Sequence, residues 1–349
     1  MTSAAGPAEE GDRRNVSDAT GVVVLGACAG WSLITAAVHD GRPEGVLLAV
    51  LAVAAGYAAG RICGAILPVA GLGAAALTGV ALAAAAPHLS AGPEVVAPLG
   101  HAGATAAVLV LATGAACCAA WAVRAPALRL GLRVLAVGIM VTAAVLGSVG
   151  GSAACAAVLL SSLAAGRMRH HRAAGFAGLF LASTAVTGLV WAVAGRAVPE
   201  GLAVSLEGQL TRQRIELWHD ALHLAHRDAA LGVGPGRFGE LSTTAAQTLQ
   251  SDGKPHSAPL QQAAEQGVVG VVLLAAAFCW LLYTLWRSPR PTPVALTAGA
   301  ALTALAAIAA VGNALSFTTV SVGAGLLAGL ATARPLADDG RPRGDRPAP

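Results

Sequence analysis

Four side chains in one polar segment of an otherwise apolar chain are suited to phosphate binding and proton transfer: Arg214, Arg237, His256 and Glu265. Arginine keeps its charge and binds phosphate oxygens in pairs. A histidine accepts a proton near neutral pH. Arg237 lies in the glycine-rich stretch GPGRFG, residues 234–239, whose backbone N–H groups add further phosphate donors. Together these residues predict a site that holds a pyrophosphate-bearing ligand beside a hydroxyl that must be activated.

Polar residues follow the histidine immediately before a long apolar run: Ser257, the amides Gln261 and Gln262, and Glu265. Glu265 and the two amides are spaced about one turn apart on the helix that leads into this run. A carboxylate beside an imidazole raises the basicity of the ring. We therefore expect Glu265, Ser257 and Gln261 to support the site, by orienting His256 or by binding the hydroxyl groups of a sugar.

The elements that must position these residues are membrane helices. The chain of 349 residues is 56% hydrophobic and only 11% charged, with a mean hydropathy of +0.68. Its apolar residues form runs of about 20, the length of a helix that crosses a bilayer. The sequence predicts an all-α, polytopic integral membrane protein with about ten transmembrane helices. Their approximate limits are 21–38, 45–60, 65–86, 102–123, 134–149, 152–166, 173–195, 267–286, 294–312 and 315–333. The fifth and sixth runs are short and joined by Gly150 and Gly151, so one broken helix is an alternative.

The arginines predict the orientation. If the N-terminus is cytoplasmic, the basic residues fall in the inside segments, as the positive-inside rule requires. The two short loops predicted outside, residues 39–44 and 87–101, contain between them only Arg42. We expect the cytoplasmic membrane as the location, both termini inside, and a first helix that is not a cleaved signal. The inside arginines are Arg13, Arg14, Arg61, Arg124, Arg129, Arg133, Arg167, Arg169, Arg172, Arg287, Arg290 and Arg334.

One predicted extracytoplasmic loop of about 70 residues, 196–266, is much longer than the other connections between the apolar runs. Within it Ile215, Trp218, Leu222 and Ala225 recur at helical spacing, which predicts an amphipathic helix lying on the membrane surface or on the bundle. Loops of this length are usually functional or disordered, and the helical pattern favours function. The predicted divisions are a polar cytoplasmic N-terminus (1–20), an N-terminal bundle (21–195), the catalytic loop (196–266), C-terminal helices (267–333) and a disordered cytoplasmic tail (334–349).

Small residues predict how some of the helices pack. Gly56, Gly60 and Gly64 have the small-xxx-small spacing that lets helix backbones approach closely in lipid. A GC-rich genome would give the same alanine and glycine content without any packing role. The six cysteines all fall in apolar runs and match no zinc spacing, so we interpret them as packing residues: Cys28, Cys63, Cys117, Cys118, Cys155 and Cys279.

Two short patterns suggest other chemistry and are set aside. HDALH, from His219 to His223, resembles a zinc-protease motif with Asp220 in place of the glutamate base. No third ligand follows, so the polar face of an interfacial helix is the better interpretation of His219, His223 and His226. GPGRFG fits a dinucleotide fingerprint, but that requires a preceding strand, and here a helix precedes it. No basic stripe with interleaved aromatics indicates nucleic acid.

The order of parts resembles the outer-loop region of the O-antigen ligase and polysaccharide polymerase family. Arg214 precedes Trp218 on a helix, LGVGPGRF follows, and His256-Ser257 then opens the next transmembrane helix, which carries Glu265. The resemblance covers residues 212–286, about a fifth of the chain. Ser257 stands where many members have asparagine.

The resemblance implies a metal-independent glycosyltransferase without a cofactor, acting in cell-surface polysaccharide biosynthesis. Such enzymes move a glycan from an undecaprenyl-pyrophosphate carrier to an acceptor hydroxyl outside the cytoplasmic membrane. By position, His256 matches the family's proposed general base or donor-orienting histidine. Arg214 matches an arginine of the outer-loop helix, and Arg237 is a second pyrophosphate ligand. The acceptor is a glycan, a lipid or a protein, and ligase and polymerase are not distinguished.

Two other classes of membrane protein remain as alternatives. A transporter or flippase for lipid-linked glycans predicts ionisable residues at mid-membrane and two similar halves, whereas the apolar runs are nearly free of charge. A non-catalytic membrane scaffold needs only the amphipathic helix and predicts that His256 is replaceable.

Overall fold

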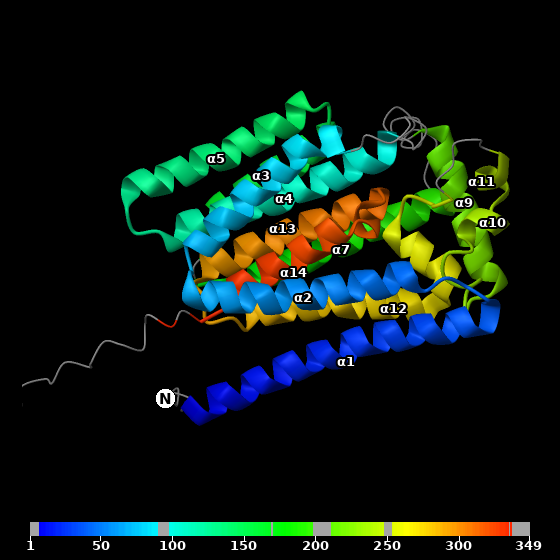
Figure 1. The fold of residues 1–349 in the computed structure, drawn as a ribbon, viewed down its shortest axis with the longest axis horizontal. Coiled ribbons are helices and arrows are strands. Elements are labelled where there is room, and N and C mark those ends of the chain that lie inside the picture. Colours follow the sequence, from blue (N-terminus) through cyan, green and yellow to red (C-terminus); the bar gives the residue numbers. More distant parts are fainter. Residues whose placement is uncertain are drawn as a thin grey trace, which may run out of the picture.

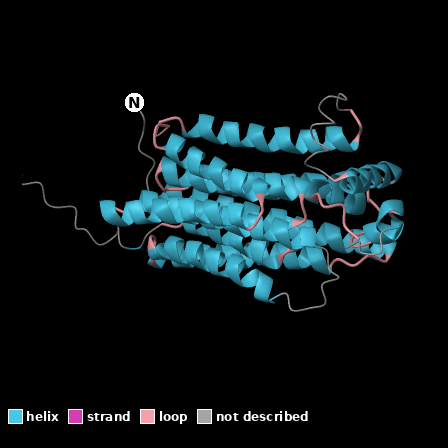
Figure 2. Ribbon diagram, turned by 90° about the horizontal axis from the view of Figure 1, so that it is seen from above, coloured by secondary structure: helices cyan, strands magenta, loops and turns pink. Residues whose placement is uncertain are grey.

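The computed structural model describes residues 7–89, 98–168, 170–197, 211–247, 253–334 and 336, and within these ranges it is helical without strands. Figure 2 shows helices joined by short connections throughout the described chain. The longer helices are α1 (Pro7–His39), α2 (Glu44–Ile66), α3 (Ala70–Leu89), α4 (Pro98–Ala122), α5 (Pro126–Val145), α6 (Val149–Ala165), α7 (Arg172–Ala194), α9 (Arg212–Arg227), α12 (Ala258–Trp286), α13 (Thr292–Val311) and α14 (Thr318–Thr332). Three short elements complete the described fold: α10 (Phe238–Leu241), α11 (Thr243–Gln247) and η1 (Ala314–Ser316).

The length and composition of these helices are those of a polytopic membrane protein. Seven described helices are long and apolar enough to cross a membrane, and α3, α6 and α14 contain shorter apolar helices. Each of the ten predicted apolar runs corresponds to one of these helices. The fifth and sixth runs are two separate helices, α5 and α6, because the chain turns at Gly147 with φ 75° and Ser148 caps α6 by accepting from Gly151 N. The alternative of one broken helix is therefore wrong.

The long helices lie side by side and the polar elements gather at one end of the bundle (Figure 1). We call this the α9 end; it contains α9, α10, α11, the first turns of α12 and the α1–α2 connection. The opposite end, which we call the arginine end, contains the α4–α5, α6–α7 and α12–α13 connections. Arg172 donates to the carbonyl of Arg290, and Arg290 donates to the carbonyl of Gly64, so these connections meet there. Helices α4 and α13 are the most deeply buried and form the centre of the core.

The prediction of close glycine packing is confirmed for α2. An added Cβ on Gly56 or Gly60 would meet a backbone carbonyl of α14 at 2.3 Å. On α14, added Cβ atoms on Gly325 and Gly329 would in turn meet backbone carbonyls of α2 at 2.2 and 2.3 Å. The two backbones are therefore in direct contact, which in lipid gains packing energy without a hydrophobic driving force.

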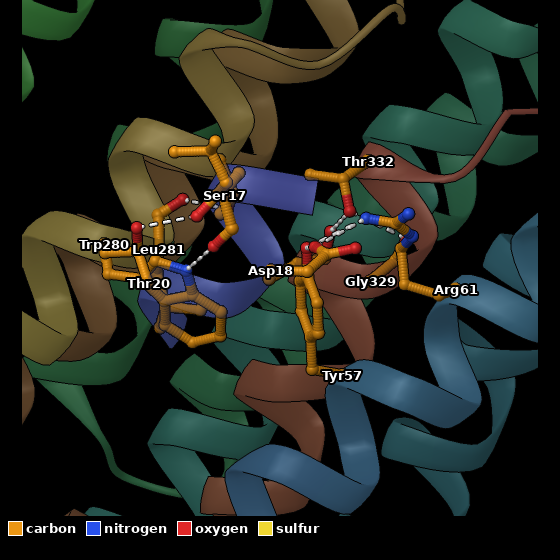
Figure 3. Close-up of polar contacts among 12 residues, drawn as sticks. Ser17, Asp18, Thr20, Tyr57, Arg61, Trp280, Leu281, Gly329 and Thr332 are labelled. Carbon is orange, nitrogen blue, oxygen red and sulfur yellow. Dashed lines mark hydrogen bonds and ion pairs between the residues drawn. The ribbon is translucent and has the colours of Figure 1, made fainter. Parts of the chain in front are cut away.

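Helix α1 lies at the edge of the bundle and is joined to it near the arginine end by the polar cluster of Figure 3. Trp280 Nε1 donates to the carbonyl of Ser17 at 3.0 Å, and its ring lies 5.1 Å from that of Tyr57. Arg61 binds Asp18 at 3.3 Å and the Tyr57 hydroxyl at 3.1 Å. This cluster fixes α1 against α2 and α12.

Candidate functional site

The α9 end is built around a break in α12. Gly267 has φ 66° and ψ −164°, a backbone conformation outside the helical region that is essentially restricted to glycine. The break frees the carbonyls of Ala264, Glu265 and Gln266 from the helix. They accept from Val233 N at 2.8 Å, Gly234 N at 2.9 Å and Trp31 Nε1 at 3.0 Å. Backbone groups at membrane depth must be satisfied within the protein, and here the loop after α9 and the indole of α1 satisfy them.

Glu265 holds the glycine-rich loop. Its side chain is 3% exposed, and its carboxylate accepts hydrogen bonds from the backbone N–H groups of Gly236 and Phe238 and, at 3.3 Å, from Gln261 Nε2. Glu265, which the sequence predicts as a supporting residue, thus contacts the loop that carries Arg237.

The glycine-rich loop also docks on the α1–α2 connection. Arg237 donates through Nη1 to the carbonyl of His39 at 2.7 Å, and its Nε lies 3.8 Å from Glu240. Arg42 N donates to the carbonyl of Pro235 at 2.7 Å, and His39 Nε2 lies 3.8 Å from Asp228. The guanidinium of Arg237 therefore caps the C-terminal end of α1. His39 and Arg42 are contributors that sequence reasoning missed, because nothing local links residue 39 to residue 237.

Arg214 lies on the buried face of α9. The buried residues of this helix are Leu217, Trp218, Ala221, Leu224 and Ala225, whereas Ile215 and Leu222 are half-buried. The buried face is therefore rotated from the predicted one toward Arg214, which precedes Trp218 by one turn and Ala221 by about two.

The guanidinium of Arg214 is half-buried, and no hydrogen bond or ion pair to it is found within the described ranges. Burial lowers the pKa of this guanidinium from its ordinary value, although arginine stays protonated in proteins. By contrast, Arg212 on the same helix is 91% exposed and paired with Glu216. Among the described residues, Arg214 is thus a cation without a counter-charge on a face that packs against the bundle.

His256 and Ser257 form the start of α12. His256 has φ 53°, a left-handed conformation that costs a non-glycine residue about 1–3 kcal/mol. Ser257 is the N-cap residue, but its hydroxyl makes no capping hydrogen bond; it is 1% exposed and has no hydrogen-bond partner among the described residues. Trp218 Nε1 of α9 is likewise buried without a partner there. Strained backbone and buried unpaired polar groups both occur preferentially at functional sites.

Helix α9, which carries Arg214, packs against α12, which His256 precedes. Trp218 of α9 and Leu260 of α12 belong to one apolar cluster. Beyond this cluster, Val268 N donates to the carbonyl of Ala229 at 2.9 Å, so the chain just after α9 contacts α12 at its break. Arg214 and His256 precede Trp218 and Leu260 by one turn each, toward the N-terminal ends of α9 and α12 and away from that contact. A fixed cation, an imidazole and a buried hydroxyl are the groups needed to bind an anionic leaving group and accept a proton.

The HDALH pattern has a structural role in this fold. Asp220 accepts from Ser242 Oγ at 2.7 Å, Thr243 Oγ1 at 3.2 Å and Thr244 N at 3.0 Å, which joins α9 to α10 and α11. His219 Nδ1 lies 3.3 Å from the carbonyl of Ala194. Among the described residues, no group of three or more His, Cys, Asp and Glu is placed to hold a metal ion.

Comparison with known proteins gives no relative: no protein family, no curated protein and no solved structure matches the chain. The geometry of the α9 end is therefore the basis for assigning a function.

Proposed function

We propose that this protein is an O-antigen ligase-like membrane glycosyltransferase of cell-surface polysaccharide biosynthesis. It moves a glycan from an undecaprenyl-pyrophosphate carrier to an acceptor hydroxyl at the outer face of the cytoplasmic membrane, as a ligase or a polymerase. The observation that carries the proposal is the half-buried guanidinium of Arg214, which has no acceptor among the described residues. It lies on α9, a helix that packs against α12, and Ser257, with a buried hydroxyl, is the N-cap of α12 directly after His256.

The roles follow from the chemistry of each group. Arg214 binds the pyrophosphate and neutralises the charge that develops as the carrier leaves. His256 takes the proton of the acceptor hydroxyl while its oxygen bonds to the anomeric carbon and the bond to the pyrophosphate oxygen breaks, an inverting transfer. Arg237 is the second pyrophosphate ligand of the proposal, and in the structure its guanidinium contacts the carbonyl of His39 and the carboxylate of Glu240. Glu265 and Gln261 support the site by holding the loop.

The proposed topology has about ten spans, both termini inside and the α9 end outside. The arginine end then faces the cytoplasm, which the positive-inside rule favours. In the described spans most ionisable side chains lie within about a turn and a half of a helix end, namely Asp18, His39, Glu44, Arg61, Arg129 and Arg172, whereas Arg133 and Glu265 lie about two turns in from one. A transport path needs such groups at mid-membrane, so their placement favours surface chemistry over a transporter or flippase.

The experiment is turnover of a lipid-pyrophosphate-linked oligosaccharide by the purified protein, measured as release of the carrier pyrophosphate. We expect Arg214→Ala to reduce turnover about 10²- to 10³-fold, the usual effect of removing one preorganised electrostatic donor. We expect His256→Ala to reduce it about 10²- to 10⁴-fold.

Arg212→Ala is the matched control, because Arg212 is on the same helix but is 91% exposed and paired with Glu216. It should retain the wild-type rate. Equal turnover in all variants would remove Arg214 and His256 from the mechanism, and a full rate for His256→Ala alone would leave the histidine without a catalytic role.

A further inference from the structure

An apolar groove opens between α7 and α12 near the arginine end. It has a volume of about 310 Å³ and is lined by the first turns of α7 and the last turns of α12. Phe180, Tyr283 and Trp286 contribute aromatic walls and are each more than 40% exposed. Phe176 forms a buried wall and Ala177 lines the groove with a small side chain. The lining offers almost no polar surface, so the groove suits a hydrocarbon chain and not a peptide, whose backbone needs hydrogen-bond partners.

The groove ends at a cation on the arginine side. The guanidinium of Arg287 lies over the ring of Trp286, 5.9 Å from its centroid, and Tyr283 lies 6.0 Å from the same ring. Arg287 is exposed, and no carboxylate is paired with it in the part of the chain that is described. Tryptophan and tyrosine with an adjacent arginine are the residues that anchor helices at the level of lipid headgroups.

Arg172 closes this end of the groove. It is the first residue of α7, and its guanidinium donates to the carbonyls of Leu285 and Arg290 and to Ser288 Oγ. These bonds hold the N-terminal end of α7 beside the C-terminal end of α12. The N-terminal end of α7 has no side-chain cap from His171, so its free N–H groups add partial positive charge at the same place.

The whole arginine end is positive. Arg124, Arg133 and Arg167 are exposed there together with Arg287. Of the carboxylates whose side chains are described, only Asp18 lies at this end, and it is paired with Arg61. Among the described side chains an anionic headgroup therefore meets more positive than negative charge at this end, worth about 1 kcal/mol per arginine near a membrane surface.

We infer that the groove between α7 and α12 binds a phospholipid with an anionic headgroup. One acyl chain lies along the wall formed by Phe176, Phe180 and Tyr283. The phosphate lies by Arg287 and the N-terminal end of α7, in the leaflet at the arginine end. The groove runs about 10 Å along α7 from Ala173 to Phe180, enough for part of an acyl chain. This site is at the opposite end of the molecule from the proposed transferase site and does not depend on it.

The test is lipid retention by the delipidated, detergent-purified full chain, measured by native mass spectrometry. Phosphatidylglycerol and phosphatidylcholine with the same acyl chains are titrated in parallel. We expect phosphatidylglycerol to be retained about five-fold more tightly, the ratio expected of one favourable arginine contact. Arg287→Gln should remove this preference while leaving the weaker, headgroup-independent binding. Ala177→Trp, which fills the groove from an exposed position, should reduce the retention of both lipids.

Arg133→Gln is the matched control, because Arg133 is exposed at the same end and lies over Trp121 at 5.6 Å, away from the groove. It should leave both affinities unchanged. The inference is overturned if the two lipids bind equally to the wild type, if Ala177→Trp has no effect, or if Arg133→Gln acts as strongly as Arg287→Gln. The last result would mean general attraction to a positive surface. Phe180→Ala gives a second variant of the groove wall should Ala177→Trp fail to fold; unchanged retention in it would also contradict the inference.

Discussion

The carboxylate of Glu265 is buried where α12 breaks, and it accepts hydrogen bonds from two backbone N–H groups of the glycine-rich loop. Glu265→Ala would leave the N–H groups of Gly236 and Phe238 without that acceptor. A buried donor left unpaired costs about 1–3 kcal/mol. We expect a clear fall in the apparent melting temperature of the purified protein, followed by tryptophan fluorescence. Gln261→Ala, which removes only the 3.3 Å contact to the same carboxylate, should have a smaller effect. Equal shifts in both variants would mean that Glu265 does not hold the loop.

Asp220 is a second residue whose role is set by hydrogen bonds. Burial acts to raise the pKa of this carboxyl, but the hydrogen bonds from Thr244, Ser242 and Thr243 outweigh it and lower the pKa below its ordinary value of 3.8. Because the pKa is lowered in the folded state, the stabilisation is present above that value and is lost as the pH falls through the folded pKa. We expect α11 to loosen from α9 only in strongly acidic solution.

The measurement is amide hydrogen exchange of residues 243–247 between pH 6 and pH 2, with Asp220→Asn at each pH as the reference for intrinsic exchange rates. The variant should exchange faster than the wild type at pH 6, and the difference should vanish at the acid end. A constant ratio across the range would show that ionisation of Asp220 does not stabilise the junction.

At the scale of elements, the break in α12 decides the shape of the α9 end. An alanine at position 267 would adopt a conformation that L side chains rarely take, and its Cβ would lie 2.4 Å from the carbonyl oxygen of Ala230. The backbone strain alone costs about 1–3 kcal/mol. Gly267→Ala should therefore lower the apparent melting temperature and separate the loop from α12.

The control is Gly178→Ala, in the middle of α7, where an added Cβ meets nothing within 4 Å. This change should be neutral or stabilising by about 0.5–1 kcal/mol, the usual helical advantage of alanine over glycine. If Gly267→Ala were equally well tolerated, α12 would be able to run straight and the break would not be required for folding.

The elements differ in how far the sequence predicts them. Long apolar runs located all ten bundle helices, and the spacing of Gly56 and Gly60 identified a face that does pack closely, against α14. The break at Gly267 was not predicted, since a single glycine between two helical stretches is compatible with an unbroken helix. The rotation of the buried face of α9 was also missed, because Arg214 counts as polar in any hydrophobic pattern, although it lies at the centre of that face.

The candidate site, too, is predicted from the sequence only in part. His256, Arg214 and Glu265 are chosen by residue type, and the structure places Glu265 in a buried hydrogen-bonded position. The left-handed backbone of His256 and the unpartnered hydroxyl of Ser257 depend on tertiary packing, which no local pattern contains. The attachment of Arg237 to His39 joins residues that are 198 positions apart.

At the scale of the whole molecule, charge divides the bundle into two unlike ends. Of the carboxylates whose side chains are described, all except Asp18 lie at the α9 end, and the exposed arginines of the α4–α5, α6–α7 and α12–α13 connections lie at the other. The difference favours one orientation, with the arginine end in the cytoplasm. The proposed catalysis at the outer face depends on this orientation, whereas for the lipid groove the orientation decides only which leaflet supplies the lipid.

Orientation can be measured in intact cells with a membrane-impermeant maleimide. In a variant without the six native cysteines, Glu216→Cys reports on the α9 end, because Glu216 is 48% exposed and lies away from the proposed site. Arg167→Cys reports on the arginine end, where Arg167 is exposed. We expect Glu216→Cys to be labelled in intact cells and Arg167→Cys only after the membrane is permeabilised. The reverse pattern would place Arg214 and His256 in the cytoplasm, where a glycan donor presented at the outer face cannot reach them, and the proposed transferase would have to be abandoned. The lipid groove between α7 and α12 would remain, but in the outer leaflet.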